Sequence, residues 1–306
     1  MRPGCSGTKS SLVRCSELKT RRAMRALYRE RKPPSTTTSA PAMLVVMSEK
    51  NDEQRVVDAL CNGRNVVWLT GAGLSVASGL APYRKSKDAI WANFILDWGT
   101  IEKFYDDPDV WYREFWWKGH GALHDRAATL RPNAGHDAIT RFLRRFDGHR
   151  VITQNIDRLH LASGAPAERT IEIHGRYDTF CCADGQCPRR GEALTGIGLT
   201  TSSPLPVCAA CQTVLRPVVL LFDEFYDSHP LYRSREATRW LNDADVLVCV
   251  GTSFSVGITE MALQAARDTG ATLINVNVER SDDLGFLNVL GPSEQTLPAL
   301  ADAAGA

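Results

Sequence analysis

Short apolar segments recur along this chain, and their length and β-branched composition are typical of buried parallel strands. Most of them end at a glycine or a small polar residue, and longer segments of mixed composition separate them. We therefore expect strands at residues 66–69, 150–153, 170–173, 218–222, 246–250 and 271–276.

The segments between these strands show helical periodicity. Helices are expected at about 52–62, 230–241 and 258–269, and residues 85–130 are expected to form a helical insertion that holds five of the seven tryptophans, mostly as core. Alternating strands and helices predict an α/β fold with a Rossmann-like, doubly wound parallel sheet. The clearest helical stripe, in residues 134–146, consists of Ala138, Ile139, Phe142, Leu143 and Phe146.

A glycine-rich segment, GAGLSVASGLAPYR at residues 71–84, follows the first strand. Gly71 and Gly73 there allow a tight turn that exposes backbone N–H groups to the phosphates of a ligand. The third glycine, Gly79, gives the spacing G-x-G-x5-G, which departs from the common dinucleotide pattern. A glycine-rich structural turn therefore stays open as the alternative to a phosphate site.

Two further groups of polar residues follow apolar strands. Gln154-Asn155-Ile156-Asp157 offers amides and a carboxylate, which suit ribose hydroxyls or a carboxamide, although such residues also cap turns. Gly251-Thr252-Ser253 follows the strand at 246–250, and Asn275 follows Thr272-Leu273-Ile274. In open parallel sheets ligands bind at this edge.

A histidine, His174, ends the strand at 170–173 and precedes Gly175. A histidine at a strand end can reach into a cleft and act as a general base near neutral pH. A structural role is the alternative for a single histidine. We assign that structural role to His120, His124, His136, His149, His160 and His229.

Together these segments resemble the sirtuin family over roughly residues 52–300. The glycine-rich loop, the QNID segment and the His-Gly pair occur in the family's order and spacing. Further segments that resemble family motifs are Pro132–His136, Arg216-Pro217 with Phe222-Asp223-Glu224, and Gly251-Thr252-Ser253.

The resemblance implies NAD-dependent removal of an acyl group from lysine, which yields nicotinamide, O-acyl-ADP-ribose and free lysine. His174 would deprotonate a ribose hydroxyl as the catalytic base, and Asn155 would orient the ribose or a water. Asp157 would hold the carboxamide, and Arg84 would support the loop. The NAD contacts implied are Gly71, Ala72, Gly73, Ser75, Ser78, Gly79, Tyr83, Arg84, Gln154, Asn155, Ile156, Asp157, Gly251, Thr252, Ser253 and Asn275.

The chain departs from the family pattern at specific positions. Ile-Pro-Asp-Phe-Arg becomes Leu-Ala-Pro-Tyr-Arg at 80–84, so the aspartate is lost and the proline moves to Pro82. Asp223 stands where the family has glycine, beside the expected peptide-binding strand, and Ile258 replaces a proline. No Tyr-x-x-Arg pair follows Arg84, so a neutral acyl group such as acetyl is expected.

Four cysteines between these segments predict a structural zinc site. Cys208 and Cys211 form a C-x2-C pair, and Cys182 and Cys187 form a looser C-x4-C pair upstream. Cys181 is an alternative to Cys182, whose offset from His174 matches the family. The metal would hold a small module at about residues 176–215, and unrelated buried thiols are the alternative.

Composition adds few constraints. The 306 residues carry a net charge of +1, which indicates no nucleic-acid partner, and the apolar segments are too short to indicate a membrane partner. Residues 1–46 are basic and are expected to be a disordered tail, a targeting segment or an extension upstream of a start at Met43 or Met47, followed by a catalytic domain at 47–306. The cysteine spacing favours a reducing compartment, the cytoplasm, with the mitochondrion as the alternative if the tail is a transit peptide. The oligomeric state is left open.

The expected partner is an acyl-lysine protein or peptide. Two other functions stay open. An ADP-ribosyltransferase or NAD hydrolase would use the same pocket, and Asp223 beside the peptide strand would favour it. A non-catalytic binding module is the second alternative, and the intact His174 and QNID segment argue against it.

Overall fold

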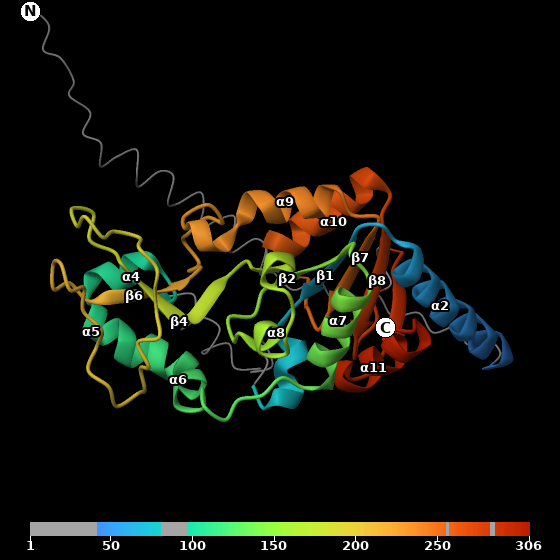
Figure 1. The fold of residues 1–306 in the computed structure, drawn as a ribbon, viewed down its shortest axis with the longest axis horizontal. Helices are drawn as coiled ribbons and strands as arrows, with labels where there is room; N and C mark the ends of the chain where they lie inside the picture. The colour runs from blue at the N-terminus through green and yellow to red at the C-terminus, as the bar shows by residue number, and fades with distance from the viewer. Residues whose placement is uncertain (1–41, 81–96, 255–256, 282–284) are drawn as a thin grey trace, which may run out of the picture. The chain divides into compact units, whose positions relative to one another are not determined.

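The computed structural model describes residues 42–80, 97–254, 257–281 and 285–306, and residues Met47–Ala306 form one compact unit (Figure 1). Its large sheet has six strands, all parallel, in the order β3-β2-β1-β7-β8-β9. The predicted doubly wound parallel sheet is therefore confirmed. The strands are β1 (Val66–Thr70), β2 (His149–Thr153), β3 (Thr170–Glu172), β7 (Val246–Val250), β8 (Thr272–Asn277) and β9 (Leu287–Leu290).

Helices cover both faces of this sheet. Alternate strand residues face opposite sides, so Trp68 and Val248 pack into one core while Leu69 and Leu247 pack into the other. The first core receives α2, α7 and α11, and the second receives α9 and α10 (Figure 1). The bounds are α2 (Ala42–Asn62), α7 (Ala134–Arg145), α9 (Ser234–Asn242), α10 (Gly257–Thr269) and α11 (Ser293–Ala303).

Strand β1 lies at the point where the chain order of the sheet reverses. Its partners are β2 on one side and β7 on the other, and Thr70 pairs with both Thr153 and Val250. The carboxyl ends of three strands are therefore level at one edge. In doubly wound sheets this switch point is where ligands bind.

A smaller module carries a second sheet, which is antiparallel with the strand order β5-β4-β6. Short helices surround an aromatic core in which Trp111 and Trp116 are fully buried and their rings stack 5.9 Å apart. The predicted helical insertion and the core role of these tryptophans are thus confirmed for the described residues. The module contains α4 (Ile101–Asp106), α5 (Pro108–Trp111), the π-helical η2 (Tyr112–Trp116), α6 (Trp117–Asp125), β4 (Gly175–Cys182), β5 (Leu194–Thr195) and β6 (Leu215–Val219).

Short connecting helices complete the description. They are η1 (Ala72–Ser78), α8 (Leu159–Ala162), η3 (Ala167–Arg169) and η4 (Pro230–Tyr232).

The strand expected at 218–222 is wrong in extent and placement. The observed strand, β6, ends at Val219 and pairs with β4 in the small sheet. A short apolar segment fits a buried strand in either sheet, so periodicity could not assign it. Strand β9 and helix α11 were not predicted at all, because β9 has only four residues and α11 contains Pro298.

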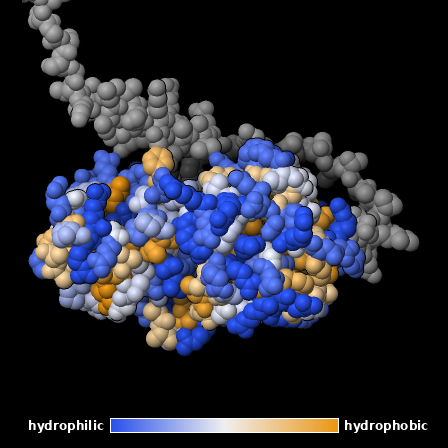
Figure 2. All heavy atoms as spheres, turned by 45° about the horizontal axis from the view of Figure 1, so that its top comes forward, coloured by the Kyte–Doolittle hydropathy of each residue, from blue (hydrophilic) through white to orange (hydrophobic). Residues whose placement is uncertain are grey.

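Hydrophilic residues predominate on the face of the molecule in Figure 2, with hydrophobic residues scattered among them. Phe225 is 77% exposed, the largest exposure among the large hydrophobic residues described. Within the described ranges, the helices are too short or too polar to span a bilayer.

Candidate active site

The glycine loop packs against the backbone at the end of β7. Gly71 N donates to Val250 O and Gly73 N donates to Gly251 O, both at 2.9 Å. A β-carbon on Gly73 would lie 2.7 Å from Gly251 Cα, and Gly251 has a φ of +56°. These contacts require glycine, which lets the two strand ends close upon each other. The short helix η1 begins at Ala72, between these two glycines of the loop.

Three predicted site residues meet where Ser75 of η1 contacts the QNID segment. Ser75 Oγ donates to Asp157 Oδ2 at 2.6 Å, and Asn155 Nδ2 donates to Ser75 Oγ at 3.1 Å and to Gly71 O at 3.0 Å. Asp157 Oδ1 also accepts from Leu159 N at 3.0 Å. All three side chains are buried, and burial raises the pKa of Asp157 although these donors act in the opposite direction. The side chains therefore hold one another in fixed orientations.

Gln154 connects two strand ends. Its backbone N donates to Thr70 O at 2.9 Å, and its Nε2 donates to Thr252 Oγ1 at 3.2 Å. Thr252 is buried, whereas Ser253 beside it is exposed. The Ile156 side chain packs against the aromatic core of the small module. The QNID segment and the Gly-Thr-Ser segment thus meet at the switch point, as the sequence predicts.

His174 lies in the turn that carries the chain from β3 of the large sheet to β4 of the small one. Its Nδ1 lies 3.0 Å from Gln154 O. A carbonyl only accepts, so Nδ1 carries the proton and Nε2 keeps its lone pair. Burial lowers the pKa of His174 to about 4, so the ring is neutral at pH 7. This is the protonation state that a general base requires.

Gly175 determines how this turn is built. Its φ is +86°, and a β-carbon there would lie 2.0 Å from Val218 O. Leu220 N donates to His174 O at 2.9 Å on the other side of the same turn. The glycine therefore allows β6 to approach closely, and this approach fixes the backbone that carries His174.

Sequence reasoning left two supporting residues of the glycine loop out of the site. Asn133 Nδ2 donates to Leu74 O at 2.8 Å and to Ser78 Oγ at 3.0 Å, and Asn133 also caps α7. Arg126 Nη1 donates to Gly79 O at 2.9 Å. Asn133 belongs to a recognised motif, so its position was visible in the sequence, whereas nothing near Arg126 distinguishes it from other surface arginines.

The prediction for Asn275 requires a correction. This residue is fully buried two positions inside β8, and its Nδ2 donates to Asn288 Oδ1 and Glu279 O. The strand continues beyond the predicted position, so the amide at its carboxyl end is Asn277, which donates to Thr252 O at 3.0 Å. Tyr83 and Arg84 lie outside the described residues.

The four predicted cysteines come together, and Cys181 is not among them. The sulfur atoms of Cys182, Cys187, Cys208 and Cys211 all lie within 4.8 Å of one another, with Sγ–Sγ distances of 3.5 Å for 182–211 and 3.7 Å for 187–208. Tetrahedral zinc thiolate geometry, with Zn–S bonds of about 2.3 Å, places sulfurs about 3.8 Å apart. The donor set therefore fits structural zinc.

The thiols of this cluster differ in how readily they ionise. Backbone N–H groups of Ala210 and Cys211 lower the pKa of Cys208 to about 7, whereas burial raises that of Cys182 to about 12. Four thiols at this spacing cannot all ionise without a cation between them. Zinc would supply that charge and hold the loops after β4 and before β6 together.

Asp223 does not reach into the site. Its Oδ1 accepts from Ile101 N at 2.7 Å and its Oδ2 accepts from Glu102 N at 3.2 Å, so it caps the start of α4. The adjacent Glu224 carboxylate accepts two bonds from Arg216, at 2.6 and 2.7 Å. The expected obstruction of the peptide strand by the Asp223 side chain is therefore not observed.

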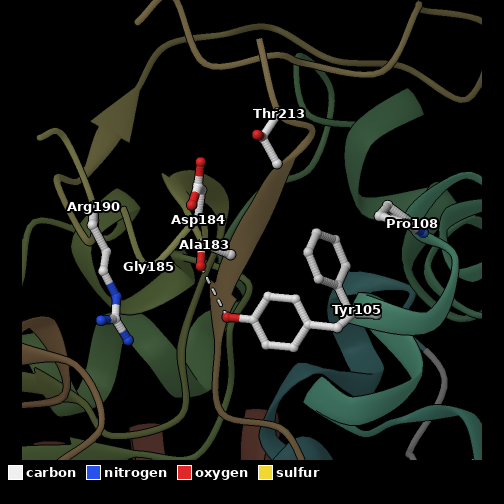
Figure 3. Close-up of a pocket in the computed structure, with 8 residues that line it drawn as sticks. Tyr105, Pro108, Ala183, Asp184, Gly185, Arg190 and Thr213 are labelled. Carbon is white, nitrogen blue, oxygen red and sulfur yellow. Dashed lines mark hydrogen bonds between the residues drawn. The ribbon is translucent and has the colours of Figure 1, made fainter. Parts of the chain in front are cut away.

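A hollow of about 380 Å³ opens on the small module, between α4 and the loop after β4 (Figure 3). The Tyr105 side chain extends across the hollow, and its hydroxyl donates to Ala183 O at 3.0 Å. Arg190 and Asp184 stand on the opposite side. None of its lining residues belongs to the predicted site.

Comparison with known proteins agrees with this geometry. The model of the Sir2 family matches residues 71–257. An NAD-dependent deacetylase, sir2E, from Dictyostelium discoideum is 34% identical over 275 residues, covering 84% of this chain and 79% of its own length. An NAD-dependent protein deacylase from Aeropyrum pernix is 35% identical over 231 residues, covering 75% and 87%.

Solved structures show the same fold. A Sir2 homologue in complex with NAD is 25% identical, with a TM-score of 0.68, and the match covers 82% of this chain and 93% of that one. A Sir2 protein with a p53 peptide and NAD is 27% identical, with a TM-score of 0.65 and coverage of 82% and 98%. Because the family model covers more than half of the chain and the curated relatives match most of its length, this chain belongs to the Sir2 family.

Proposed function

We propose that this protein is an NAD-dependent lysine deacylase that acts on acyl-lysine proteins or peptides. The observation that carries the proposal is the neutral His174 imidazole, whose Nδ1–H donates to Gln154 O and leaves the lone pair on Nε2. Relatives named as NAD-dependent deacetylases and deacylases support this activity over ADP-ribosyl transfer or NAD hydrolysis.

NAD is the co-substrate, and the switch-point edge fits it. Gly71 and Gly73 pack against the backbone of Gly251 and Thr252, and this packing holds at the switch point the loop that would bind the pyrophosphate. Asn155 and Asp157, fixed by Ser75, would bind ribose and carboxamide groups. NAD, when bound, supplies the ribose carbon that receives the acyl oxygen and the hydroxyl whose proton His174 takes.

The substrate strand is proposed to lie beside residues 222–224. Phe222 N donates to Gly99 O at 2.9 Å, and Asp223 and Glu224 are held by α4 and by Arg216. This loop is thus anchored on the small module, with its carboxylates already paired. We propose an uncharged acyl group such as acetyl, which the absence of a Tyr-x-x-Arg pair after Arg84 supports.

We propose the cytoplasm as the compartment, with the mitochondrion as the alternative if residues 1–46 are a transit peptide. In the described ranges all seven cysteines are free thiols, and four of them form the metal cluster. Free thiols are typical of reducing compartments.

The test is to incubate the purified protein with NAD and an acetyl-lysine peptide, and to follow products by mass spectrometry. We expect O-acetyl-ADP-ribose, nicotinamide and deacetylated peptide in equal amounts. His174→Ala should lower this rate by about 10²- to 10⁴-fold, the usual contribution of a general base. His229→Ala is the matched control, because its imidazole instead bonds Gly191 O.

The outcomes distinguish the alternatives. Nicotinamide release with an unchanged peptide would replace the proposal with NAD hydrolysis or ADP-ribosyl transfer. Full activity of His174→Ala would remove His174 from the role of base.

A further inference from the structure

One residue of β3 holds both ends of the QNID segment. Glu172, the last residue of β3, pairs with Thr153, the last residue of β2 and the one directly before Gln154. The Glu172 carboxylate also accepts from Arg158 Nη1, directly after Asp157. We propose that Glu172 is a positioning residue for the nicotinamide end of the site, which acts through Arg158 to hold Asp157 in its binding orientation. This inference rests on the proposed function, in which Asp157 binds the carboxamide of NAD.

The backbone of Arg158 is the reason that this support is needed. Its φ is +69° and its ψ is 6°, in the left-handed region that favours glycine. The chain turns there from the QNID segment into α8, which begins at Leu159. Asp157 Oδ1 accepts from Leu159 N across this turn, and Asp157 Oδ2 accepts from Ser75 Oγ. The conformation of Arg158 therefore determines where the Asp157 carboxylate points.

Carboxylates from two strands hold the Arg158 guanidinium. Besides the contact with Glu172, Arg158 Nε lies 3.2 Å from Asp178 Oδ2, in β4 of the small module. The Glu172 side chain is 3% exposed, whereas that of Asp178 is 38% exposed. Solvent screens a buried ion pair less than an exposed one, so Glu172 provides the main support for the strained turn.

A second arginine pairs with the same carboxylate from β4. Arg176 Nε lies 2.6 Å from the Glu172 oxygen that Arg158 also contacts. Burial raises the pKa of Glu172, and the guanidinium groups of Arg158 and Arg176 act against this rise. When either arginine is removed, the carboxylate keeps a cationic partner. Each arginine can therefore be tested alone.

Two ligands report on Asp157 separately from the rest of the site. ADP-ribose has the adenosine, the pyrophosphate and the second ribose of NAD, but a hydroxyl in place of nicotinamide. A misplaced Asp157 carboxylate should therefore weaken the binding of NAD and leave the affinity for ADP-ribose unchanged. A general loss of stability, or a displaced glycine loop, would weaken both ligands alike.

The first measurement is calorimetric titration of the full chain with NAD and with ADP-ribose, in the absence of peptide. Glu172→Gln keeps the shape of the side chain and removes its charge. Its NAD affinity should fall about tenfold, the equivalent of one hydrogen bond, while ADP-ribose affinity stays within about twofold. Equal losses for the two ligands, or an unchanged NAD affinity, would overturn the proposal.

This readout needs no deacylation. The proposed role of Glu172 therefore stands if NAD binds as expected but the protein proves to be an NAD hydrolase. A wild-type protein that binds ADP-ribose but not NAD would contradict the proposed function and this inference with it.

Arg176→Gln is the matched control. It removes the other guanidinium from the same carboxylate and leaves the pair between Arg158 and Glu172 in place. The ratio of NAD affinity to ADP-ribose affinity should stay within about twofold of the wild-type ratio. A tenfold fall of this ratio in Arg176→Gln would show that the charge of the cluster matters and not its hold on Arg158, which contradicts the proposal.

Arg158→Gly tests the same contact from the other side, and it leaves Glu172 paired with Arg176 if Glu172→Gln folds poorly. Glycine adopts a φ of +69° without strain, but no side chain then ties the turn to β3. NAD affinity relative to ADP-ribose should again fall about tenfold, and adding Glu172→Gln should lower it no further. A wild-type ratio in Arg158→Gly, or full additivity of the two losses, would show that Glu172 does not act through Arg158.

Discussion

The large sheet and the small module hold their candidate sites by different means. At the switch-point edge, backbone contacts between Gly71, Gly73 and Gly251 and bonds among short polar side chains set the geometry. In the small module, Cys187 and Cys208 sit in long loops whose only strand is the two-residue β5. The first site is thus formed by strand register, whereas the second requires a metal to bring its loops together.

This difference determines which changes would damage each site. The strand-edge site tolerates loss of its ligand but not added volume, because the backbones of two strand ends are in contact. The cysteine site tolerates changes in its loops but not loss of one ligand. The aromatic core around Trp111 and Trp116 also contains the buried ligands Cys182, Cys187 and Cys208, so we expect loss of zinc to loosen the helical half of the module as well as the cysteine loops.

The largest effect is expected from breaking the metal site. Cys208→Ser should abolish stoichiometric zinc and lower the unfolding midpoint by about 10 °C or more, because a three-thiolate site binds structural zinc far more weakly. Zinc content by mass spectrometry and hydrogen exchange of residues 183–214 would measure this. Exchange should rise in that segment first and leave β1, β2 and β7 protected.

Cys181→Ser is the matched control for this change. Cys181 is adjacent to Cys182 and equally buried, but it packs with Val218 and Tyr232 instead of the cluster. Full zinc content is therefore expected in this variant. A loss of zinc in Cys181→Ser with retention in Cys182→Ser would contradict the assigned ligand set.

A smaller but more local effect is expected at the strand edge. Gly73→Ala places a β-carbon 2.7 Å from Gly251 Cα, so the loop must move away from β7. We expect NAD affinity, measured by calorimetry, to fall at least about 30-fold, or about 2 kcal/mol, with zinc content unchanged. Gly119→Ala is the control, since a β-carbon there meets nothing within 4 Å. Wild-type affinity in Gly73→Ala would show that NAD does not use this loop.

The same contrast explains what the sequence could predict. Strands β1, β2 and β7 have clear apolar patterns, and their ends carry Gly71, Gln154 and Gly251, so the edge of the sheet was predictable. The four cysteines were identified by spacing. In both cases the functional residues lie in short sequence segments whose composition and spacing can be recognised without the structure.

Contacts made across the fold were not predictable. Tyr226 meets His174 from 52 positions away, and Asp223 finds its donors at Ile101 and Glu102 in another element. Neither residue type marks such a contact, because tyrosine and aspartate occur at many surfaces and strand ends. The strand expected at 271–276 ends one residue before β8 does, and Asn275 was assigned to its carboxyl end instead of Asn277. Such errors arise because strand ends depend on pairing with neighbours, not on local pattern.

The smallest effect is expected at Asp223, which caps α4 beside the proposed peptide strand. Asp223→Ala removes two acceptors from the first turn of α4, although Thr100 still caps Lys103 N. Loss of a helix cap costs about 1 kcal/mol, so the free energy of unfolding in urea should fall by about that amount.

Asp223→Asn sharpens this prediction, because one amide oxygen can still accept from Ile101 N while the charge is lost. We expect it to recover part of the stability, and both variants to keep KM for the acetyl-lysine peptide within about threefold, since the carboxylate faces α4 and not the peptide strand. If Asp223→Ala instead left stability unchanged and lowered the peptide KM tenfold, the side chain would have to leave α4 in solution and obstruct the strand. The ADP-ribosyl-transfer alternative would then regain its strongest argument.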